Sequence, residues 1–184
     1  FTYTDVDMGG CAIDKYEDPL PDSELEKCVG SDSVLLGAVG GCKWNGLPGE
    51  KRPEKGLLRL RAGMGVYSNN RPAKIWRQLA DASPLKSSIV DRGIDFIIVR
   101  ELIGGIYFGA HIPEGNTATD VLRYREPEIE RIGRIGFETA RRRSRRLCSV
   151  EKSNGLDSSR MWKRVMHRLA EEYPDVELSD MLVD

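Results

Sequence analysis

The sequence lacks the features that mark membrane proteins, disulfide scaffolds and nucleic-acid-binding proteins. No apolar run approaches the roughly 20 residues of a membrane-spanning helix, so no membrane partner is expected. The net charge of -1 provides no global field that would draw the chain to nucleic acid or to a lipid surface. The 4 cysteines form no C-x-x-C motif and no paired histidines accompany them, so we expect reduced thiols in a cytoplasmic protein.

Two further absences concern the fold. No G-x-G-x-x-G fingerprint is present, so an ordinary Rossmann dinucleotide site is not supported. No repeat or low-complexity segment divides the chain. What remains is 184 residues with 40% hydrophobic and 31% charged side chains, which is the composition of a globular protein with one domain or parts of two.

Hydrophobic patterns predict strands that alternate with helices. Helices are expected to begin near Pro21, at Pro53, at Glu126 and after Asp157. The expected strands are 1–8, 33–39, 96–102, 106–112 and 147–150. The alternation favours the α/β class, whereas the antiparallel-looking stretch 96–124 argues against a purely parallel sheet.

The predicted helix after Pro53 carries the most readable local chemistry. Glu54, Leu57, Leu58 and Arg61 are spaced by three and four residues, so they share one helical face. An acid, two leucines and a base on one face would suit a substrate with a carboxylate and a branched alkyl tail. An amphipathic core helix with a charged rim fits the same pattern, and the spacing alone leaves both readings open.

Three arginines stand inside apolar or glycine-rich stretches. They are Arg61, Arg71 and Arg100, and Arg100 directly follows the apolar run 96–99. Because a guanidinium is costly to desolvate unless an anion meets it, these arginines indicate a pocket for a small polycarboxylate. Tyr107 and Lys152 would supply acid and base groups beside it. Pairing of each arginine with a structural glutamate is the alternative.

Several longer motifs occur in order along the whole chain. They are Leu35-Leu36-Gly37-Ala38-Val39-Gly40-Gly41, Arg52-Pro53-Glu54-Lys55-Gly56-Leu57-Leu58, Asn70-Arg71-Pro72-Ala73-Lys74, Val99-Arg100-Glu101-Leu102, Gly104-Gly105-Ile106-Tyr107-Phe108-Gly109 and Ser149-Val150-Glu151-Lys152-Ser153-Asn154. On these motifs the chain resembles the family of β-decarboxylating hydroxyacid dehydrogenases, in its isopropylmalate branch.

The resemblance implies a two-domain α/β fold of the isopropylmalate dehydrogenase type, with a mixed sheet, which binds NAD without an ordinary Rossmann fold. Residues 1–66 would be part of the first, cofactor-side domain, and residues 67–184 most of the second, dimer-forming and substrate-side domain. The family's opening glycine-rich strand and two of its three metal carboxylates are not found here. We therefore expect an internal fragment, incomplete in its fold and inactive in isolation.

The implied activity is NAD-dependent oxidative decarboxylation of 3-isopropylmalate to 4-methyl-2-oxopentanoate in leucine biosynthesis. A sibling enzyme acting on tartrate, malate or homoisocitrate is one alternative, and a non-catalytic regulatory paralogue is another. Isocitrate-specific relatives carry polar residues where this chain has Leu57 and Leu58, which favours the isopropylmalate branch. The presence of Tyr107, Lys152 and Asp184 argues against a silent paralogue.

The resemblance also implies a role for each site residue. The substrate would be bound by Glu54, Leu57, Leu58, Arg61, Arg71, Arg100 and Asp184. Tyr107 and Lys152 would handle protons, because oxidation of the 2-hydroxyl needs a base and the enolate left by decarboxylation needs an acid. NAD would contact Gly40, Gly41, Pro53, Glu54 and Asn154.

A divalent metal and a second subunit complete the implied site. Asp184 would be one of three carboxylates that hold Mg2+ or Mn2+, which are hard cations that prefer oxygen ligands. Lys152 and Asp184 would serve the neighbouring subunit's active site, so a homodimer is expected. The wide apolar stripe of the predicted helix 158–173 is consistent with burial in its own core and in a subunit interface.

One basic run fits a different class of protein. Five of the six residues from 141 to 146 are arginines, which would suit nucleic-acid phosphates. Cations at a helix C-terminus offset the helix dipole, however, and no aromatic residues are interleaved for base stacking. A solvated helix end is therefore expected, without a nucleic-acid partner.

Overall fold

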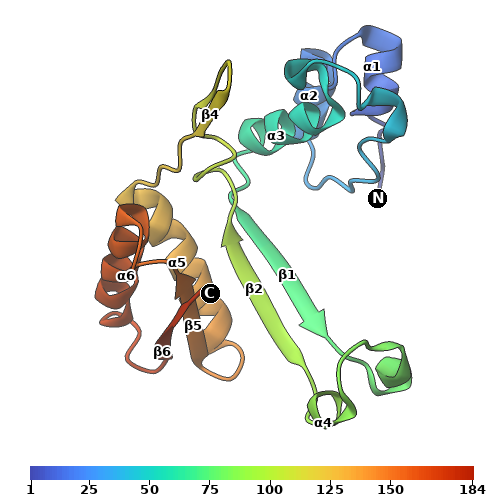
Figure 1. Cartoon of the computed structure of the whole chain (residues 1–184). Helices are drawn as coiled ribbons and strands as arrows, with labels where there is room; N and C mark the ends of the chain where they lie inside the picture. The colour runs from blue at the N-terminus through green and yellow to red at the C-terminus, as the bar shows by residue number, and fades with distance from the viewer. The chain divides into compact units, whose positions relative to one another are not determined.

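The computed structural model describes residues 1–184, which divide into two compact units, Phe1–Val66 and Tyr67–Asp184 (Figure 1). Helices and strands occur together, which confirms the predicted α/β class. None of the helices combines the length and the apolar content that a membrane crossing requires.

The first unit is built from helices. They are α1 (Gly10–Tyr16), α2 (Asp22–Val29) and α3 (Pro53–Gly63), with short 3-10 turns at Cys42–Trp44 and Gly49–Lys51. Pro53 occupies the first turn of α3, where its missing N–H has no helical partner to lose. Leu20, Cys28 and Leu60 form the buried cluster between these helices.

The strands expected at 1–8 and 33–39 are wrong, because neither segment pairs with another strand. Phe1 and Leu35 are fully exposed rather than facing a core. Side chains such as Val6 and Val34 pack against the core cluster, and the Gly10 N–H donates to the Val39 carbonyl at 2.9 Å, but neither segment forms a strand. A β-branched pattern needs a neighbouring strand to become a strand, and this unit contains none.

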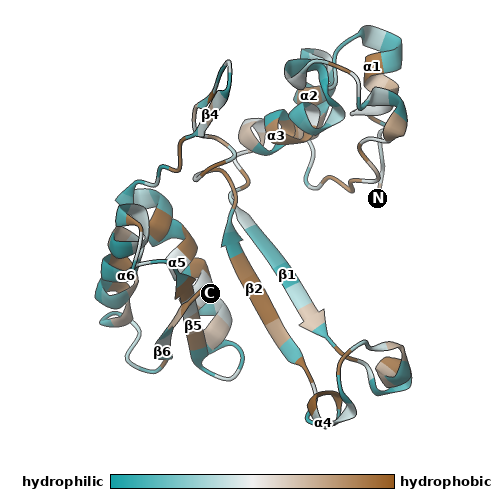
Figure 2. Cartoon of the chain, viewed as in Figure 1, coloured by the Kyte–Doolittle hydropathy of each residue, from teal (hydrophilic) through white to brown (hydrophobic).

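The second unit begins with the antiparallel ribbon of β1 (Ser68–Lys74) and β2 (Asp95–Glu101). The 3-10 helix η3 (Arg77–Ala82) and the short helix α4 (Ser87–Val90) connect the two strands. Figure 2 shows that the middle of β2 is strongly apolar between polar ends, whereas β1 is mostly polar. The strand predicted at 96–102 is thus confirmed within a residue at each end.

The strand expected at 106–112 is wrong over most of its length. Turns and bends occupy that segment, and the next strands are the short hairpin of β3 (His111–Glu114) and β4 (Thr117–Asp120). Gly105 adopts a positive φ of 82°, which breaks any extended run. A Cβ at Gly109 would lie 1.8 Å from the Val121 oxygen, so the chain folds back tightly here.

The rest of the second unit is a strand–helix–strand layer on a long helix. Its elements are α5 (Glu126–Arg141), β5 (Arg146–Glu151), α6 (Asp157–Ala170) and β6 (Glu177–Leu182). β5 and β6 are parallel, with α6 as the crossover, so the unit contains both parallel and antiparallel pairings. Phe137 is fully buried and stacks on Tyr173 with ring centroids 4.8 Å apart. Val165, Met166 and Leu169 of α6 join the same core, which uses much of that helix's apolar stripe.

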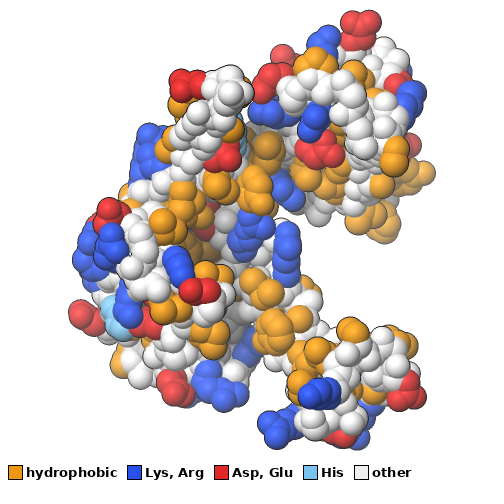
Figure 3. Space-filling view, viewed as in Figure 1, with side chains coloured by type: hydrophobic (Ala, Val, Ile, Leu, Met, Phe, Trp, Pro, Cys, Tyr) orange, Lys and Arg blue, Asp and Glu red, His pale blue; other side chains and the backbone are white.

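Acidic and basic side chains alternate on the outer surface of α5 and α6. Figure 3 shows red and blue atoms mixed over α6. Within the predicted basic run, Arg141 pairs with Asp175 at 2.6 Å and Arg143 pairs with Asp95. Exposed pairs of this kind contribute little to stability. They show that two of these arginines bind protein carboxylates at the end of α5.

Candidate functional site

Helix α3 uses one face for the core and leaves another open. Leu60 is buried, and a Cβ at Gly56 would lie 2.5 Å from the Pro19 oxygen, so this face packs tightly against the chain before α2. Leu57 and Leu58 are only half-buried and take no part in the core cluster. Leu57 and Leu58 therefore lie beside the core face of α3, with part of each side chain exposed.

A glycine cradle lies against the start of α3. A Cβ at Gly40 would approach the Pro53 Cβ to 3.2 Å and the Glu54 Oε1 to 3.3 Å. Gly41 borders the Trp44 ring in the same loop. The structure thus brings together the cofactor-site residues expected in the first unit, whereas Asn154 lies in an exposed turn of the second unit.

Arg71 and Arg100 point to the same face of the β1–β2 ribbon. Arg100 is opposite Asn69 and Arg71 is opposite Ile98, so the two arginines are diagonal neighbours. Arg71 donates from Nε to the Asn69 Oδ1 at 2.6 Å, which orients its guanidinium along the strand. Two guanidinium groups on one face can bind the two carboxylates of a small diacid. Arg61 lies on α3 in the first unit.

Tyr107 lies beside Arg100. The Arg100 guanidinium carbon is 5.3 Å from the centre of the Tyr107 ring, within the range of a cation–π contact. The Tyr107 side chain is otherwise largely exposed. The phenol and one anion-binding arginine can therefore reach the same small molecule.

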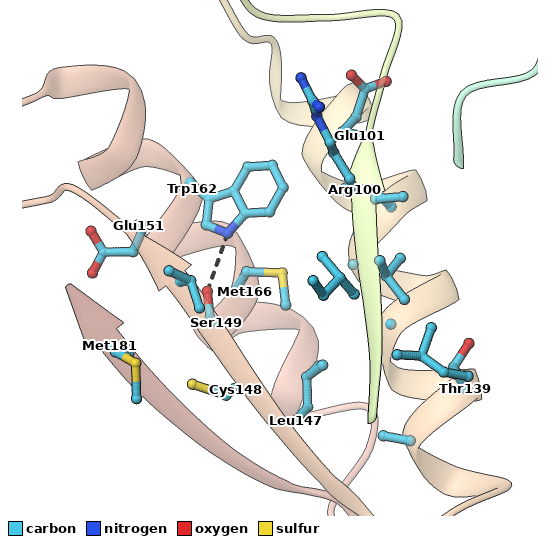
Figure 4. Close-up of a pocket in the computed structure, with 18 of the residues that line it drawn as sticks. Arg100, Glu101, Thr139, Leu147, Cys148, Ser149, Glu151, Trp162, Met166 and Met181 are labelled. Carbon is cyan, nitrogen blue, oxygen red and sulfur yellow. Dashed lines mark hydrogen bonds between the residues drawn. The ribbon is translucent and has the colours of Figure 1, made fainter. Parts of the chain in front are cut away.

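A cavity of about 1000 Å3 separates β2 from β5, with α5 and α6 on its other walls (Figure 4). Arg100 and Glu101 stand at one end of it, where β2 finishes. Trp162 crosses part of the space and donates from Nε1 to the Ser149 Oγ at 3.1 Å. The remaining lining is mainly apolar, and it includes Leu147, Met166 and Met181.

Lys152 and Asp184 meet where the two parallel strands end. Lys152 follows β5, Asp184 follows β6, and Lys152 Nζ donates to Asp184 Oδ2. The turn after Lys152 is closed by the N–H groups of Gly155 and Leu156, which both donate to the Lys152 oxygen at 3.0 Å. Lys152 and Asp184 therefore contact each other, whereas Tyr107 contacts Arg100.

No group of three histidine, cysteine, aspartate or glutamate side chains in residues 1–184 is arranged to hold a metal ion. Asp184 supplies one carboxylate, which is already bonded to Lys152. Divalent cations take about six or more oxygen ligands, so these residues alone do not fit a bound ion. No catalytic step is assigned to a metal on this geometry.

Sequence reasoning missed the buried carboxylates that support the site. Glu101 accepts the Gly104 N–H at 2.6 Å and also pairs with Arg131. Glu151 accepts a hydrogen bond from the Ser153 hydroxyl at 2.9 Å, and so braces the turn that carries Lys152. Both glutamates lie within motifs of the sequence, Glu101 in residues 99–102 and Glu151 in residues 149–154. Their charge next to apolar strand residues is the signal that would have found them.

Tyr124 is a further residue without a predicted role. Burial raises the pKa of the Tyr124 hydroxyl, and the negative charge of Glu101 raises it further. A Cβ at Gly105 would lie 2.5 Å from its oxygen, so Tyr124 packs directly under the glycine turn. It therefore shapes the segment that leads to Tyr107.

The fold defines an α/β protein in which Arg71 and Arg100 share one ribbon face and Tyr107 lies beside Arg100. The sequence profile of the isocitrate/isopropylmalate dehydrogenase family matches residues 1–184, and the chain belongs to this family. It is 52% identical over 188 residues to the 3-isopropylmalate dehydrogenase of Clostridium acetobutylicum. It is 49% identical over 184 residues to that of Wolinella succinogenes.

Solved structures agree with the family assignment. The chain is similar to a β-decarboxylating dehydrogenase from Thermococcus kodakarensis in its apo form, with a TM-score of 0.72 and 28% identity over 100% of this chain and 49% of that one. It is also similar to isocitrate dehydrogenase from Methylococcus capsulatus, with a TM-score of 0.72 and 27% identity over 96% of this chain and 50% of that one. The alignments to the Clostridium and Wolinella enzymes cover 100% of this chain and 53% and 51% of those proteins, so the chain spans about half their length.

Proposed function

We propose that the full-length protein is an NAD-dependent 3-isopropylmalate dehydrogenase. It oxidises C2 of the substrate and releases the C3 carboxylate as CO2, which yields 4-methyl-2-oxopentanoate in leucine biosynthesis. The observation that carries this proposal is the 52% identity to the Clostridium acetobutylicum 3-isopropylmalate dehydrogenase along 100% of the chain.

The open face of α3 supports the choice of substrate. Leu57 and Leu58 receive the isopropyl group, because they are half-buried and lie outside the core cluster. Glu54 borders the same group, and Arg61 lies about one turn after the two leucines on this face. Arg71 and Arg100 bind the malate carboxylates, and their position on one ribbon face supports this role.

Two proton transfers are assigned to this chain's own residues. NAD, when bound beside Gly40, Gly41, Pro53, Glu54 and Asn154, supplies the hydride acceptor for C2. Lys152 takes the proton of the 2-hydroxyl, and Tyr107 delivers a proton to C3 once CO2 has left. Lys152 acts as the neutral amine in this step, and Asp184 holds its side chain in place and reaches the substrate.

The proposal extends to the assembly. We place residues 1–66 on the cofactor side and residues 67–184 on the substrate and dimer side of a cytoplasmic homodimer. Lys152 and Asp184 would act in the neighbouring subunit's site, and Asp184 would provide one ligand to Mg2+ or Mn2+.

Absorbance at the NADH band tests the activity. The full-length protein is incubated with NAD, Mg2+ or Mn2+, and one of 3-isopropylmalate, isocitrate, malate or tartrate. NADH should form fastest with 3-isopropylmalate, with release of CO2. A higher kcat/KM for isocitrate or tartrate would assign the protein to a sibling activity, and no turnover on any of them would reject the proposal.

A further inference from the structure

The carboxylate of Glu101 is the most deeply buried charge near the candidate site. Its side chain is 1% exposed at the end of β2. One oxygen accepts from the Arg131 guanidinium of α5, and the other accepts the Gly104 N–H at 2.6 Å. The Arg131 guanidinium carbon also lies 4.4 Å from the centre of the Tyr67 ring. The carboxylate therefore joins the end of a strand, a helix and the next turn of the chain.

Glu101 and Arg100 project to opposite sides of β2. Successive side chains of a strand alternate between its faces, so the same two residues serve two environments. Arg100 faces the Tyr107 ring, whereas Glu101 faces Arg131. The contacts that hold Glu101 in place therefore also hold the adjacent backbone of Arg100, whose side chain contacts Tyr107.

The glycine turn between Glu101 and Tyr107 is held at two successive amides. The Gly104 N–H donates to Glu101, and the Gly105 N–H donates to the Arg123 oxygen at 3.0 Å. Tyr124 packs closely against both glycines, and at Gly105 a Cβ would lie 2.5 Å from the Tyr124 oxygen. Tyr107 follows two residues later.

A role in stability alone explains this pair poorly. Arg131 Nε is buried and has no hydrogen-bond partner, so the ion pair is incompletely satisfied. Buried ion pairs often contribute no more to stability than apolar residues of similar size. The bond from Glu101 to Gly104, by contrast, acts directly on the segment that leads to Tyr107.

We propose that Glu101 is a positioning residue: its bond to Gly104 sets the turn that brings Tyr107 beside Arg100, and Arg131 holds the carboxylate for this task. The consequence for catalysis rests on the proposed function, in which Tyr107 delivers a proton. The consequence for the turn itself does not depend on any activity.

Two double variants of the full-length protein separate the Gly104 bond from the ion pair. Both remove the charges together, since removing Arg131 alone would leave the Glu101 carboxylate buried and unpaired. E101Q/R131M keeps a side-chain oxygen that can accept the Gly104 N–H, whereas E101M/R131M has none. Glu172→Gln with Arg134→Met is the matched control, because it removes an exposed ion pair whose arginine lies on the same helix α5.

Hydrogen exchange of the backbone amides of residues 102–109 is the first readout. Exchange should be about tenfold or more faster in E101M/R131M than in E101Q/R131M, since a lost bond to a buried partner has this magnitude. The control should exchange like the wild type. Glu101→Asp, which keeps the charge but shortens the side chain, should also exchange faster, and it serves if either double variant fails to fold.

The second readout compares the change in kcat with the change in KM. For 3-isopropylmalate, kcat should fall about tenfold in E101M/R131M and recover in E101Q/R131M, while KM changes less because the arginines remain. Equal exchange in the two double variants, or an unchanged turn in Glu101→Asp, would overturn the positioning role. Wild-type protein without turnover on 3-isopropylmalate would overturn the proposed function instead, and exchange would still decide on Glu101.

Discussion

Lys152 and Asp184 form a direct ion pair at the carboxyl ends of two parallel strands. The residues are 32 positions apart in sequence. The pairing of Glu151 with Leu182 in the β5–β6 register brings them together, and the Val183 N–H reinforces it by donating to the Glu151 oxygen at 3.0 Å. The strand register thus positions the Lys152 side chain, to which we assign a proton transfer.

Replacement of Lys152 by alanine in the full-length protein should lower turnover by orders of magnitude. The lysine handles protons in the proposed reaction, so NAD affinity should stay nearly unchanged. Steady-state NADH formation and a fluorescence titration with NAD measure the two effects. Lys163→Ala is the matched control, since Lys163 of α6 also pairs with an aspartate near this strand pair, Asp180 of β6, at 3.1 Å. More than half of the wild-type turnover in Lys152→Ala would remove this residue from the mechanism.

Polar replacement of Leu57 and Leu58 should change substrate selectivity. Loss of a well-packed alkyl contact is worth about 1–3 kcal/mol in discrimination. The double variant Leu57→Ser and Leu58→Ser should therefore lose far more kcat/KM for 3-isopropylmalate than for malate, which has no alkyl branch.

Leu60→Ala provides the control for this pair. Leu60 belongs to the buried cluster of the first unit, so its replacement should lower stability by about 2–5 kcal/mol and leave the ratio of the two kcat/KM values unchanged. Equal losses on both substrates in the Leu57 and Leu58 variant would contradict the proposed role of these leucines.

The sequence predicted the elements whose patterns are local. Helices α3, α5 and α6 have proline or capping signals at their starts and apolar residues at helical spacing, and all three formed close to the expected positions. The segments 1–8 and 33–39 have strand patterns too, but they have no partner strand in their unit. A strand depends on residues far away in sequence, and no local pattern contains that information.

The candidate site, too, could be predicted from the sequence only in part. Isolated arginines such as Arg71 and Arg100 were visible in the sequence, and the motifs led to the family that the comparisons confirm. That these two arginines share a ribbon face depends on the β1–β2 register, which the sequence did not reveal. The contact of Glu101 with Arg131 spans 30 positions, so it required the packing of α5 on β2. The catalytic and binding roles themselves stay predictions.

Acid should weaken the first unit through Glu24. The hydrogen bond from Lys27 holds the pKa of this buried carboxyl below its ordinary value of 4.5, with a further contribution from the Asp7 N–H. A carboxyl with a lowered pKa in the folded state stabilises the fold above its unfolded pKa, and this contribution is lost as the pH falls through the folded pKa. The unfolding temperature should therefore fall with acidification below about pH 4.5.

The variant Glu24→Gln tests this assignment. It should unfold at a lower temperature than the wild type at neutral pH, and the difference should shrink as the pH falls from about 6 to about 3. Glu26→Gln, at an exposed position on the same helix, should leave the pH profile of the wild type unchanged. Circular dichroism melts across this range measure both, and a constant difference for Glu24→Gln at all pH values would refute the assignment.

Two glycines of α3 should respond differently to replacement by alanine. Alanine favours a helix over glycine by about 1 kcal/mol. At Gly56 the added methyl would lie 2.5 Å from the backbone oxygen of Pro19, which cannot rotate away, so overpacking should prevail and cost about 1–3 kcal/mol. At Gly63 the nearest atom is a Leu25 side-chain methyl at 2.8 Å, which a rotamer change can move. Urea unfolding should therefore show Gly56→Ala to be clearly less stable than Gly63→Ala, and the reverse order would mean that α3 does not pack closely on Pro19.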